Sequence, residues 1–299
     1  MSDNHLRLAV TGLTGQVVSA LIARAPRDVE IIALGRPQLE LAKRDAVLAS
    51  LRHAQCDAII NAAAYTQVDK AESEADLAMR INGDGAENVA QAAAELGVPL
   101  LHLSTDYVFD GSLDRPYQED DQTNPTSVYG RSKLAGEEQI RALHSRHVIL
   151  RTAWVYSPYG ANFAKTMLRL GADREEVSVV CDQLGNPTSA LDIADALIEI
   201  AKRLSRDNSE ALCGTFHMSG QGEASWADMA QAIFDASQAK GRKPVKVRRI
   251  TTQDYPTPAK RPANSRLDNA KLNNSYSITL PHWRSSLTQC VEQLLQESN

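Results

Sequence analysis

Apolar residues in the first half of the chain fall into short runs that alternate with longer stretches of helical periodicity. Each short run is bounded by polar or turn residues, which is typical of a buried strand. The expected strands are Leu6–Val10, Glu30–Leu34, Asp57–Ile60, Pro99–Ser104 and His147–Arg151. The expected helices are Val17–Ala23, Ala46–His53, Ile81–Leu96 and Ser132–His144.

Almost continuously apolar strands separated by helices indicate a parallel sheet that is covered on both faces. Right-handed crossovers then lead to a Rossmann-type, doubly wound α/β fold. Beyond Arg151 the rhythm loosens and prolines interrupt the chain, although a helix at Ala190–Lys202 and a strand at Gly214–Met218 are expected to return to the sheet. We therefore expect one domain from residues 1–150 plus about 188–218, and a smaller, loop-rich lobe from about 151–187 and 219–299.

Composition and charge narrow the class of protein. The 299 residues are 43% hydrophobic and 23% charged, with a net charge of -5, which argues against a nucleic-acid-binding protein with a basic stripe. The local basic run from Lys240 to Arg249 is either a solvated face beside a strand or a surface near an anionic ligand. No stretch approaches the ~18 apolar residues of a membrane span, so we expect no membrane association.

The expected location is the cytoplasm. The polar start Met1–His5 does not resemble a signal peptide. The four cysteines are scattered without ligand or disulfide spacing, and Cys56 and Cys290 lie among apolar residues as small core side chains would. Such cysteine usage is typical of a reducing compartment.

A glycine loop follows the first expected strand. Gly12-Leu-Thr-Gly-Gln-Val17 stands between a strand and a helix, where backbone N–H groups and the positive helix end meet a dinucleotide pyrophosphate. Gly12 permits the tight turn and Gly15 the close approach, with Thr14, Gln16 and Val17 beside them. The third glycine position of the fingerprint is Val18, so this motif alone is weak and an ordinary turn would look similar.

The residue at the end of the second expected strand bears on the choice between NADH and NADPH. An acidic residue there would bind the ribose 2′-hydroxyl, but this chain has Arg36, whose guanidinium suits a 2′-phosphate. NADPH is therefore expected in preference to NADH, which remains possible. After the third strand, Ala62, Ala63, Ala64 and Tyr65 offer mostly small side chains along the dinucleotide groove.

Three residues on two further segments form a catalytic constellation. Thr105 stands at the carboxyl end of the fourth strand, where α/β sheets bind ligands. Tyr129 and Lys133 are spaced to share one helix face. A free tyrosine has a pKa near ~10, and a neighbouring ammonium with an oxidised nicotinamide would lower it. Tyr129 is then expected to be the general acid of a carbonyl reduction, with Thr105 orienting the oxygen and Lys133 also holding the ribose.

The sequence resembles the extended short-chain dehydrogenase/reductases and, more narrowly, the dTDP-4-dehydrorhamnose reductase family. The likeness covers nearly the whole chain. It is carried by Asn61–Glu72, Ser104–Gly111, Val128–Glu137, Arg151–Tyr156, Asn162–Met167, Asp182–Thr188 and Tyr255–Leu267. The dehydratases of the superfamily have a glutamate directly after the Thr-Asp pair; here that position is Tyr107, so water elimination is not expected.

The resemblance implies hydride transfer from NAD(P)H to C4 of a dTDP-4-keto-6-deoxy-L-sugar, giving dTDP-L-rhamnose. It implies that Thr105, Tyr129 and Lys133 are the catalytic triad and that Asp106 and Trp154 line the sugar. The loop from Tyr255 to Arg266 would bind the nucleotide diphosphate. Arg261 and Arg266 in that loop could each meet a phosphate with two hydrogen bonds.

Some family members are dimers bridged by Mg²⁺ through three glutamates. Aligned by the motifs, this chain has Ala20, Leu191 and Gln293 at those positions. Because Mg²⁺ needs oxygen ligands, we expect no required metal, and either a monomer or a dimer that no metal bridges. Two alternatives remain open: a non-catalytic, NADP-binding regulatory subunit, or another nucleotide-sugar reductase or epimerase. Both catalytic side chains are present, which speaks against the first.

Overall fold

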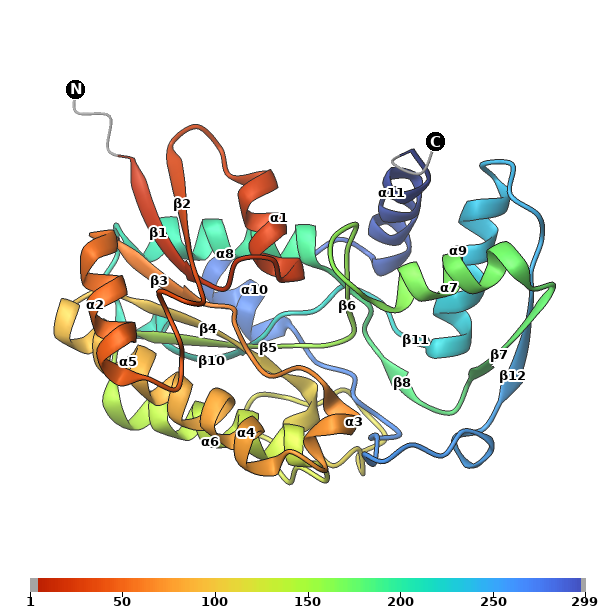
Figure 1. The fold of residues 1–299 in the computed structure, drawn as a ribbon, viewed down its shortest axis with the longest axis horizontal. Helices are drawn as coiled ribbons and strands as arrows, with labels where there is room; N and C mark the ends of the chain where they lie inside the picture. The colour runs from red at the N-terminus through yellow and green to blue at the C-terminus, as the bar shows by residue number, and fades with distance from the viewer. Residues whose placement is uncertain (1–4, 297–299) are drawn as a thin grey trace.

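The computed structural model describes residues 5–296. Its centre is a six-stranded parallel sheet in the order β10-β5-β4-β3-β1-β2 (Figure 1). The first crossovers move from β1 outward to β2, and the chain then returns past β1 to β3. The strand order reverses between β1 and β3, and the carboxyl ends at such a switch point are the usual ligand site of doubly wound sheets.

The helices and strands have clear bounds. The elements of the first half are β1 Leu6–Thr11, α1 Gln16–Arg24, β2 Val29–Leu34, α2 Arg44–Ala54, β3 Ala58–Asn61, α3 Val68–Ala71, α4 Ala75–Met79, a π-turn η1 Arg80–Asp84, α5 Gly85–Leu96, β4 Leu100–Thr105, a 3-10 turn η2 Asp106–Val108, α6 Val128–Leu143 and β5 His147–Thr152. The second half contains β6 Val155–Tyr156, α7 Phe163–Asp173, β7 Glu176–Val180, β8 Leu184–Gly185, β9 Thr188–Ser189, α8 Ala190–Leu204, β10 Gly214–His217, β11 Ala224–Ser225, α9 Trp226–Gln238, β12 Lys246–Ile250, α10 Ala270–Tyr276 and α11 Trp283–Gln296.

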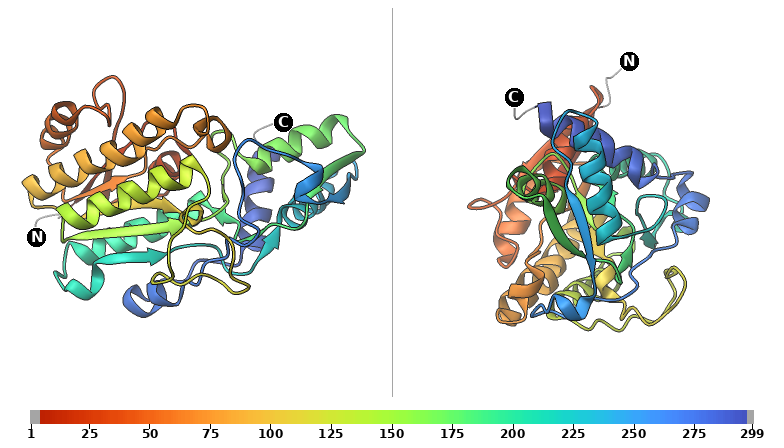
Figure 2. Two further views of the ribbon diagram at one scale, coloured as in Figure 1. Left: turned by 90° about the horizontal axis from the view of Figure 1, so that it is seen from below. Right: turned by 90° about the vertical axis from the view of Figure 1, so that its right-hand side faces the viewer.

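Both faces of the sheet are buried, which explains why the strands are apolar throughout. Helices α1 and α8 cover one face, and α2, α5 and α6 cover the other (Figures 1 and 2). Neighbouring strand residues point to opposite cores: Ile60 packs beneath α1 and α8, whereas Ile59 packs beneath α2 and α5. The predicted doubly wound fold is confirmed, and β10 joins the sheet beside β5 as expected.

Two helices begin earlier than the sequence pattern indicated. Helix α6 starts at Val128 rather than Ser132, because the Ser127 hydroxyl accepts a hydrogen bond from the Gly130 N–H at 3.1 Å and caps the first turn. Helix α5 is preceded by α4 and the π-turn η1, so helical structure begins at Ala75 rather than Ile81. The earlier start places Tyr129 inside the first turn of α6.

A second core lies beyond the sheet, at the other end of the long axis of the molecule (Figures 1 and 2). Helices α7, α9 and α11 pack together there, and β7 pairs with β12 in parallel. The second half of the basic run from Lys240 to Arg249 lies on the exposed β12, where Lys246 and Arg249 pair with Glu176 and Asp228 at 2.9 and 2.8 Å. Lys240, before the strand, pairs with Glu292 at 2.9 Å. These ion pairs favour the interpretation as a solvated face.

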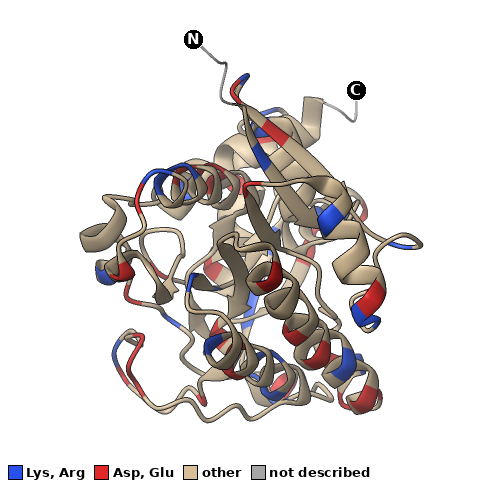
Figure 3. Cartoon of the chain, turned by 90° about the vertical axis from the view of Figure 1, so that its left-hand side faces the viewer, with Lys and Arg blue, Asp and Glu red and all other residues tan. Residues whose placement is uncertain are grey.

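Further expectations concerned the surface charge, membrane spans, the burial of the cysteines and the N-terminal segment. Acidic and basic residues are interspersed along the outer helices (Figure 3). Within residues 5–296, no helix is both long and apolar enough to cross a bilayer. Cys290 is buried as predicted, but Cys56 is only partly buried at the edge of a core. Of the N-terminal segment considered for a signal peptide, residues 1–4 lie outside the described part of the chain.

Candidate active site

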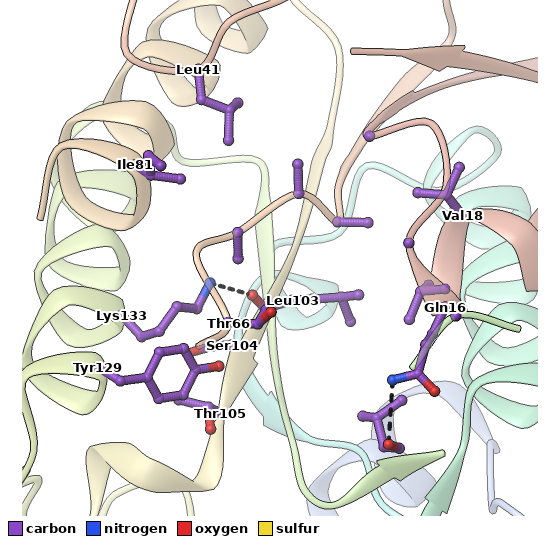
Figure 4. A pocket seen from close by; sticks show the side chains of 18 of the residues that line it. Gln16, Val18, Leu41, Thr66, Ile81, Leu103, Ser104, Thr105, Tyr129 and Lys133 are labelled. Carbon is purple, nitrogen blue, oxygen red and sulfur yellow. Dashed lines mark hydrogen bonds between the residues drawn. The ribbon is translucent and has the colours of Figure 1, made fainter. Parts of the chain in front are cut away.

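A cavity of about 1090 Å³ lies at the carboxyl ends of β1 to β4, at the switch point of the sheet. The loops after β1, β2 and β3 form one side, and the end of β4 with helix α6 forms another (Figure 4). Trp154, Phe163 and Trp226 close it from the side of the second core. The cavity therefore joins the sheet to the second core.

The glycine loop has the geometry of an anion site. Gly12 has a φ of 106°, a left-handed conformation that favours glycine. A Cβ atom at Gly12 would come within 3.1 Å of Val18 Cγ2, so the missing side chain at Gly12 makes room for the valine at the third fingerprint position. Gly15 begins α1 without a side-chain cap, and a Cβ atom there would meet open space. The first N–H groups of α1 can thus receive a phosphate.

The loop after β3 is held on the end of β1 by one hydroxyl. Thr11 Oγ1 accepts hydrogen bonds from the N–H groups of Ala62 and Ala63 at 3.1 and 3.0 Å. Ala62, Ala63 and Ala64 all line the cavity, where their small side chains leave the groove open. A dinucleotide would lie between this loop and the glycine loop.

Several other predicted cofactor residues also line the cavity: Thr14, Gln16, Val17 and Arg36. Gln16 links the glycine loop to the far wall, because its amide donates to the Val155 carbonyl at 3.4 Å and accepts from the Ser157 hydroxyl at 3.0 Å. Tyr65 does not line the cavity. Its hydroxyl donates to Glu74 at 2.8 Å, which directs the ring away from the groove.

The three predicted catalytic residues come together at one end of the cavity (Figure 4). Tyr129 and Lys133 project from α6, and Thr105 stands at the end of β4. Helix α6 approaches η2, the turn that follows β4, closely because Gly130 lacks a side chain: a Cβ atom there would lie 2.2 Å from the Tyr107 carbonyl oxygen. This contact brings the phenol of Tyr129 to the hydroxyl of Thr105.

Burial is the largest cause of the pKa shifts of Tyr129 and Lys133. It raises the pKa of Tyr129 to about 12, and a hydrogen bond with Thr105 offsets only part of the shift. It lowers the pKa of Lys133 to about 8, because an ammonium loses hydration there, and the charge of Glu137 offsets part of this. The Lys133 ammonium alone therefore does not lower the tyrosine pKa, and the expected effect of an oxidised nicotinamide stays a prediction. Tyr129 is a neutral phenol that can donate a proton.

The Lys133 side chain is almost fully buried, and polar groups lie close to its Nζ atom. Its Nζ donates to the Leu103 carbonyl at 2.8 Å, and His102 Nε2 lies 3.2 Å from the same atom. The pKa of His102 is well below its usual value, first because the ring is buried and second because Lys133 lies beside it. The imidazole is therefore neutral.

Asp106 is a buried carboxylate at the cavity wall. Its Oδ1 accepts a hydrogen bond from Thr105 at 2.9 Å, whereas its Oδ2 makes no hydrogen bond of ordinary geometry within the described chain. Burial raises its pKa to about 6, and hydrogen bonds from the side chains of Ser265 and Thr105 offset only part of this shift, so the carboxylate is charged at neutral pH. A buried acceptor without a partner is costly, and a substrate hydroxyl would satisfy it.

Trp154 lines the cavity in an unusual backbone conformation. Its φ of 47° lies in the left-handed region, which a bulky residue rarely adopts. The ring stacks on Trp226 with centroids 3.7 Å apart, and it lies over Gly185, where a Cβ atom would come within 2.5 Å of it. One face of the indole is therefore already covered by another ring.

Arg261 and Arg266 do not line the cavity. Arg261 makes two hydrogen bonds to the carboxylate of Asp69, at 3.0 and 2.8 Å. Arg266 pairs with Glu223 at 2.7 Å. Both guanidinium groups are thus bound by carboxylates of the chain. The two arginines that were expected to bind the diphosphate lie outside the cavity.

Sequence reasoning missed three residues of the site: His102, Phe163 and Trp226. A histidine within the apolar run Leu100–Leu103 was a usable signal, because a buried polar side chain in a central strand needs a partner. Nothing local marked the two aromatic residues. They reach the cavity only because α7 and α9 pack beside the end of the sheet.

Comparison with known sequences gives a consistent result. A profile of the RmlD substrate binding domain family matches residues 6–296. The dTDP-4-dehydrorhamnose reductase of Sinorhizobium fredii is 53% identical over 292 residues, which cover 98% of this chain and 99% of the relative.

Two solved structures have the same fold over nearly their whole length. The dTDP-4-dehydrorhamnose reductase of Clostridium acetobutylicum is 38% identical with a TM-score of 0.89, and the match covers 97% of this chain and 100% of that one. The reductase of Bacillus anthracis, solved in complex with NADP, is 35% identical with a TM-score of 0.89; the match covers 96% and 99% of the two chains.

Proposed function

The chain belongs to the dTDP-4-dehydrorhamnose reductase family of oxidoreductases, and on that basis we propose that it reduces dTDP-4-dehydro-6-deoxy-L-mannose to dTDP-L-rhamnose. The observation that carries the proposal is the convergence of Thr105, Tyr129 and Lys133 at one end of the cavity, on the side facing the glycine loop. The C4 keto group would be reduced to a hydroxyl there.

NADPH is the proposed cofactor, with NADH as a possible substitute. The residues present fit a dinucleotide: the uncapped start of α1 at Gly15 can hold the pyrophosphate, and the alanine loop leaves room beside it. Arg36 would bind the 2′-phosphate. The related reductase of Bacillus anthracis was solved with NADP, which supports this assignment. The cofactor supplies the hydride that C4 receives.

Tyr129 is the proposed proton donor. Because burial keeps its pKa at about 12, the phenol carries its proton at neutral pH and can give it to the C4 oxygen as that oxygen gains negative charge. Thr105 would hydrogen-bond the same oxygen and fix its position. The proton and hydride together convert the carbonyl to an alcohol, and the phenolate left on Tyr129 must then regain a proton.

The substrate contacts proposed for the sugar are Asp106 and Trp154. The unpartnered Oδ2 of Asp106 can accept a hydrogen bond from a sugar hydroxyl. Trp154 offers an aromatic ring at the cavity wall. For Arg261 and Arg266, binding of the diphosphate would require exchanging their present carboxylate partners for phosphate oxygens.

The remaining proposals concern organisation and location. We propose that residues 1–150 plus about 188–218 bind the cofactor and that about 151–187 and 219–299 bind the sugar nucleotide. The last three residues of the second range lie outside the described chain. A cytoplasmic location is proposed because the four cysteines are scattered along the sequence without disulfide spacing.

One experiment tests the reaction and the proton donor together. Purified protein, NADPH and enzymatically prepared dTDP-4-keto-6-deoxy-L-sugar should lose nicotinamide absorbance and yield dTDP-L-rhamnose, identified by NMR at C4. Tyr129→Phe should lower kcat at least about a hundredfold, the usual contribution of a positioned general acid. NADPH binding should remain.

The matched control is Tyr276→Phe, because the Tyr276 hydroxyl bonds the Leu212 carbonyl away from the cavity. This variant should keep full activity. Absence of NADPH oxidation by the wild type would refute the reductase, and an active Tyr129→Phe would refute the proton donor alone.

A further inference from the structure

His102 connects the catalytic lysine to a chain of buried polar side chains across three strands. His102 Nδ1 lies 3.0 Å from Asn61 Nδ2, and Thr11 Oγ1 lies 2.7 Å from Asn61 Oδ1. All three side chains are at most 2% exposed. On the other side, His102 Nε2 faces Lys133 Nζ at 3.2 Å. The chain thus runs from the end of β1 through β3 and β4 to α6.

The direction of the hydrogen bonds follows from Thr11. Its hydroxyl oxygen already accepts from the N–H groups of Ala62 and Ala63, so its own hydrogen must be given to an acceptor. The acceptor within reach is Asn61 Oδ1. The amide nitrogen of Asn61 must then face His102, and it donates to Nδ1.

This direction determines the tautomer of His102. A neutral imidazole that accepts at Nδ1 carries its hydrogen on Nε2, and that N–H points at Lys133. A lysine ammonium has only donors, so a charged Lys133 would place two donors against each other. A neutral amine would instead accept the hydrogen bond with its lone pair. The Leu103 carbonyl accepts from the amine in either state.

Other groups near this pair do not reverse the effect. Glu137 favours the ammonium, but its carboxylate is already bound by Arg151 at 2.7 Å and by Ser104 at 2.5 Å. Other charged or titratable side chains near this pair are Tyr129 on the same helix, Asp106 and Arg80 at the cavity wall, Arg141 beside Glu137, and His147, which acts on His102. The charge of Asp106 acts on Tyr129. Tyr129 carries no charge at neutral pH, and Arg80 carries the same charge as the ammonium.

We infer that His102, oriented by Asn61 and Thr11, is a positioning residue that makes the Lys133 ammonium a stronger acid, so that Lys133 returns a proton to Tyr129 after each reduction. The proton leaves Nζ and reaches the Tyr129 phenolate through a water molecule in the cavity. The amine that remains accepts the His102 N–H and regains a proton from solvent. The polar chain itself ends on backbone N–H groups, so it orients the imidazole and carries no proton.

The test follows Lys133 directly in the free protein. Lysine labelled with carbon-13 at Cε reports amine protonation by NMR, and Lys133→Arg assigns the signal. In His102→Phe and His102→Leu the opposing N–H is removed, so Lys133 should become roughly tenfold less acidic, a rise of about one pH unit in its midpoint. His144→Gln is the control, because that buried imidazole bonds the Val98 carbonyl, not Lys133, and should leave the midpoint unchanged.

The opposite hydrogen-bond direction gives different results. If His102 accepted a hydrogen bond from the ammonium, both variants would make Lys133 more acidic. That outcome overturns the inference, as does an unchanged midpoint in both variants. Circular dichroism checks folding, and if the Phe variant does not fold, the Leu variant decides alone.

The inferred role of His102 rests on the proposed reductase, and the two can fail separately. In the active enzyme the alkaline limb of kcat/KM should move to higher pH in the same variants, with KM for NADPH unchanged. A protein without reductase activity would refute the proposed function, whereas the lysine titration needs no turnover. A shifted lysine midpoint with an unshifted alkaline limb would refute the role in returning the proton.

Discussion

Tyr129 and Lys133 lie on one helix face, yet burial moves their pKa values in opposite directions. The phenol loses less by staying neutral, so its pKa rises to about 12, whereas the ammonium loses hydration and its pKa falls to about 8. Exposed tyrosine and lysine side chains have nearly equal pKa values, about 10 and about 10.4, so burial separates the two values and makes the ammonium the stronger acid. This order suits a donor phenol that is recharged by its neighbour.

The pH dependence of the reaction follows from Lys133. Its ammonium is present below about pH 8 and is lost above it, while Tyr129 keeps its proton throughout this range. We therefore expect kcat/KM to fall about tenfold per unit as pH rises beyond about 8. Steady-state rates in buffers of constant ionic strength measure this. A flat profile up to pH 10 would contradict the assignment, and Lys133→Arg should abolish the decline.

At acidic pH, binding of the sugar nucleotide is expected to depend on Asp106. Because its pKa is raised to about 6, the carboxylate loses its charge as the pH falls through that value. Asp106→Asn should raise KM for the sugar nucleotide about tenfold or more, since hydrogen bonds to charged groups contribute roughly 1.5–3 kcal/mol. NADPH affinity, measured by fluorescence titration, should not change. An unaltered KM would exclude the carboxylate as a sugar contact.

The position of α6 depends on glycines that let backbone approach backbone. A Cβ atom at Gly136 would lie 2.2 Å from the Asn82 carbonyl oxygen, and the same distance separates a Cβ at Gly130 from Tyr107. These contacts press α6 against η1 and η2. They hold Tyr129 and Lys133 at the end of β4.

Replacing Gly136 tests the packing of this helix. In an exposed helix, Gly→Ala stabilises by about 0.5–1 kcal/mol, but here the clash with carbonyl oxygen should reverse the sign and destabilise by about 1–3 kcal/mol. Urea denaturation and kcat measured on Gly136→Ala should both show a loss. Glu138→Ala, on the exposed side of the same helix, is the control and should be neutral. A stabilised Gly136→Ala would mean that α6 can shift without cost.

At the scale of the whole molecule, two cores share one cavity. The sheet core provides the glycine loop and the catalytic cluster, and the core of α7, α9 and α11 provides Trp226 and Phe163. Gln16 bridges the two by its hydrogen bonds to Val155 and Ser157. Ligand binding is therefore expected to depend on how the two parts are held together.

The assembly of the protein should not depend on a metal. Metal-bridged relatives are expected to have glutamates at the positions of Ala20 and Leu191. Here Ala20 belongs to the apolar core beneath α1 and α8, and Leu191 packs against that core. Dialysis against EDTA should leave both the mass measured by light scattering and the activity unchanged. A dimer that dissociates in EDTA and reforms with Mg²⁺ would contradict this.

Much of the fold could be predicted because its signals are local. Each core strand is an apolar run, and the turn at Gly12 is marked by the residue itself. The starts of α5 and α6 were placed too late because the π-turn at Arg80–Asp84 and the Ser127 cap lie in polar sequence without apolar periodicity. The second core was harder to predict from the sequence, because its helices are separated by loops and its strands pair with segments far away in the chain.

The doubly wound sheet, the family and the proposed set of Thr105, Tyr129 and Lys133 could all be predicted from the sequence, because spacing and strand ends are encoded within a few residues of chain. The protonation of those side chains could not be predicted in this way. Their pKa values depend on burial, and the neighbours that bury them, such as His102 beside Lys133, come from other elements. The same holds for Arg261, which is bound to Asp69 at a separation of 192 residues. Desolvation and pairing of this kind exist only once distant segments meet.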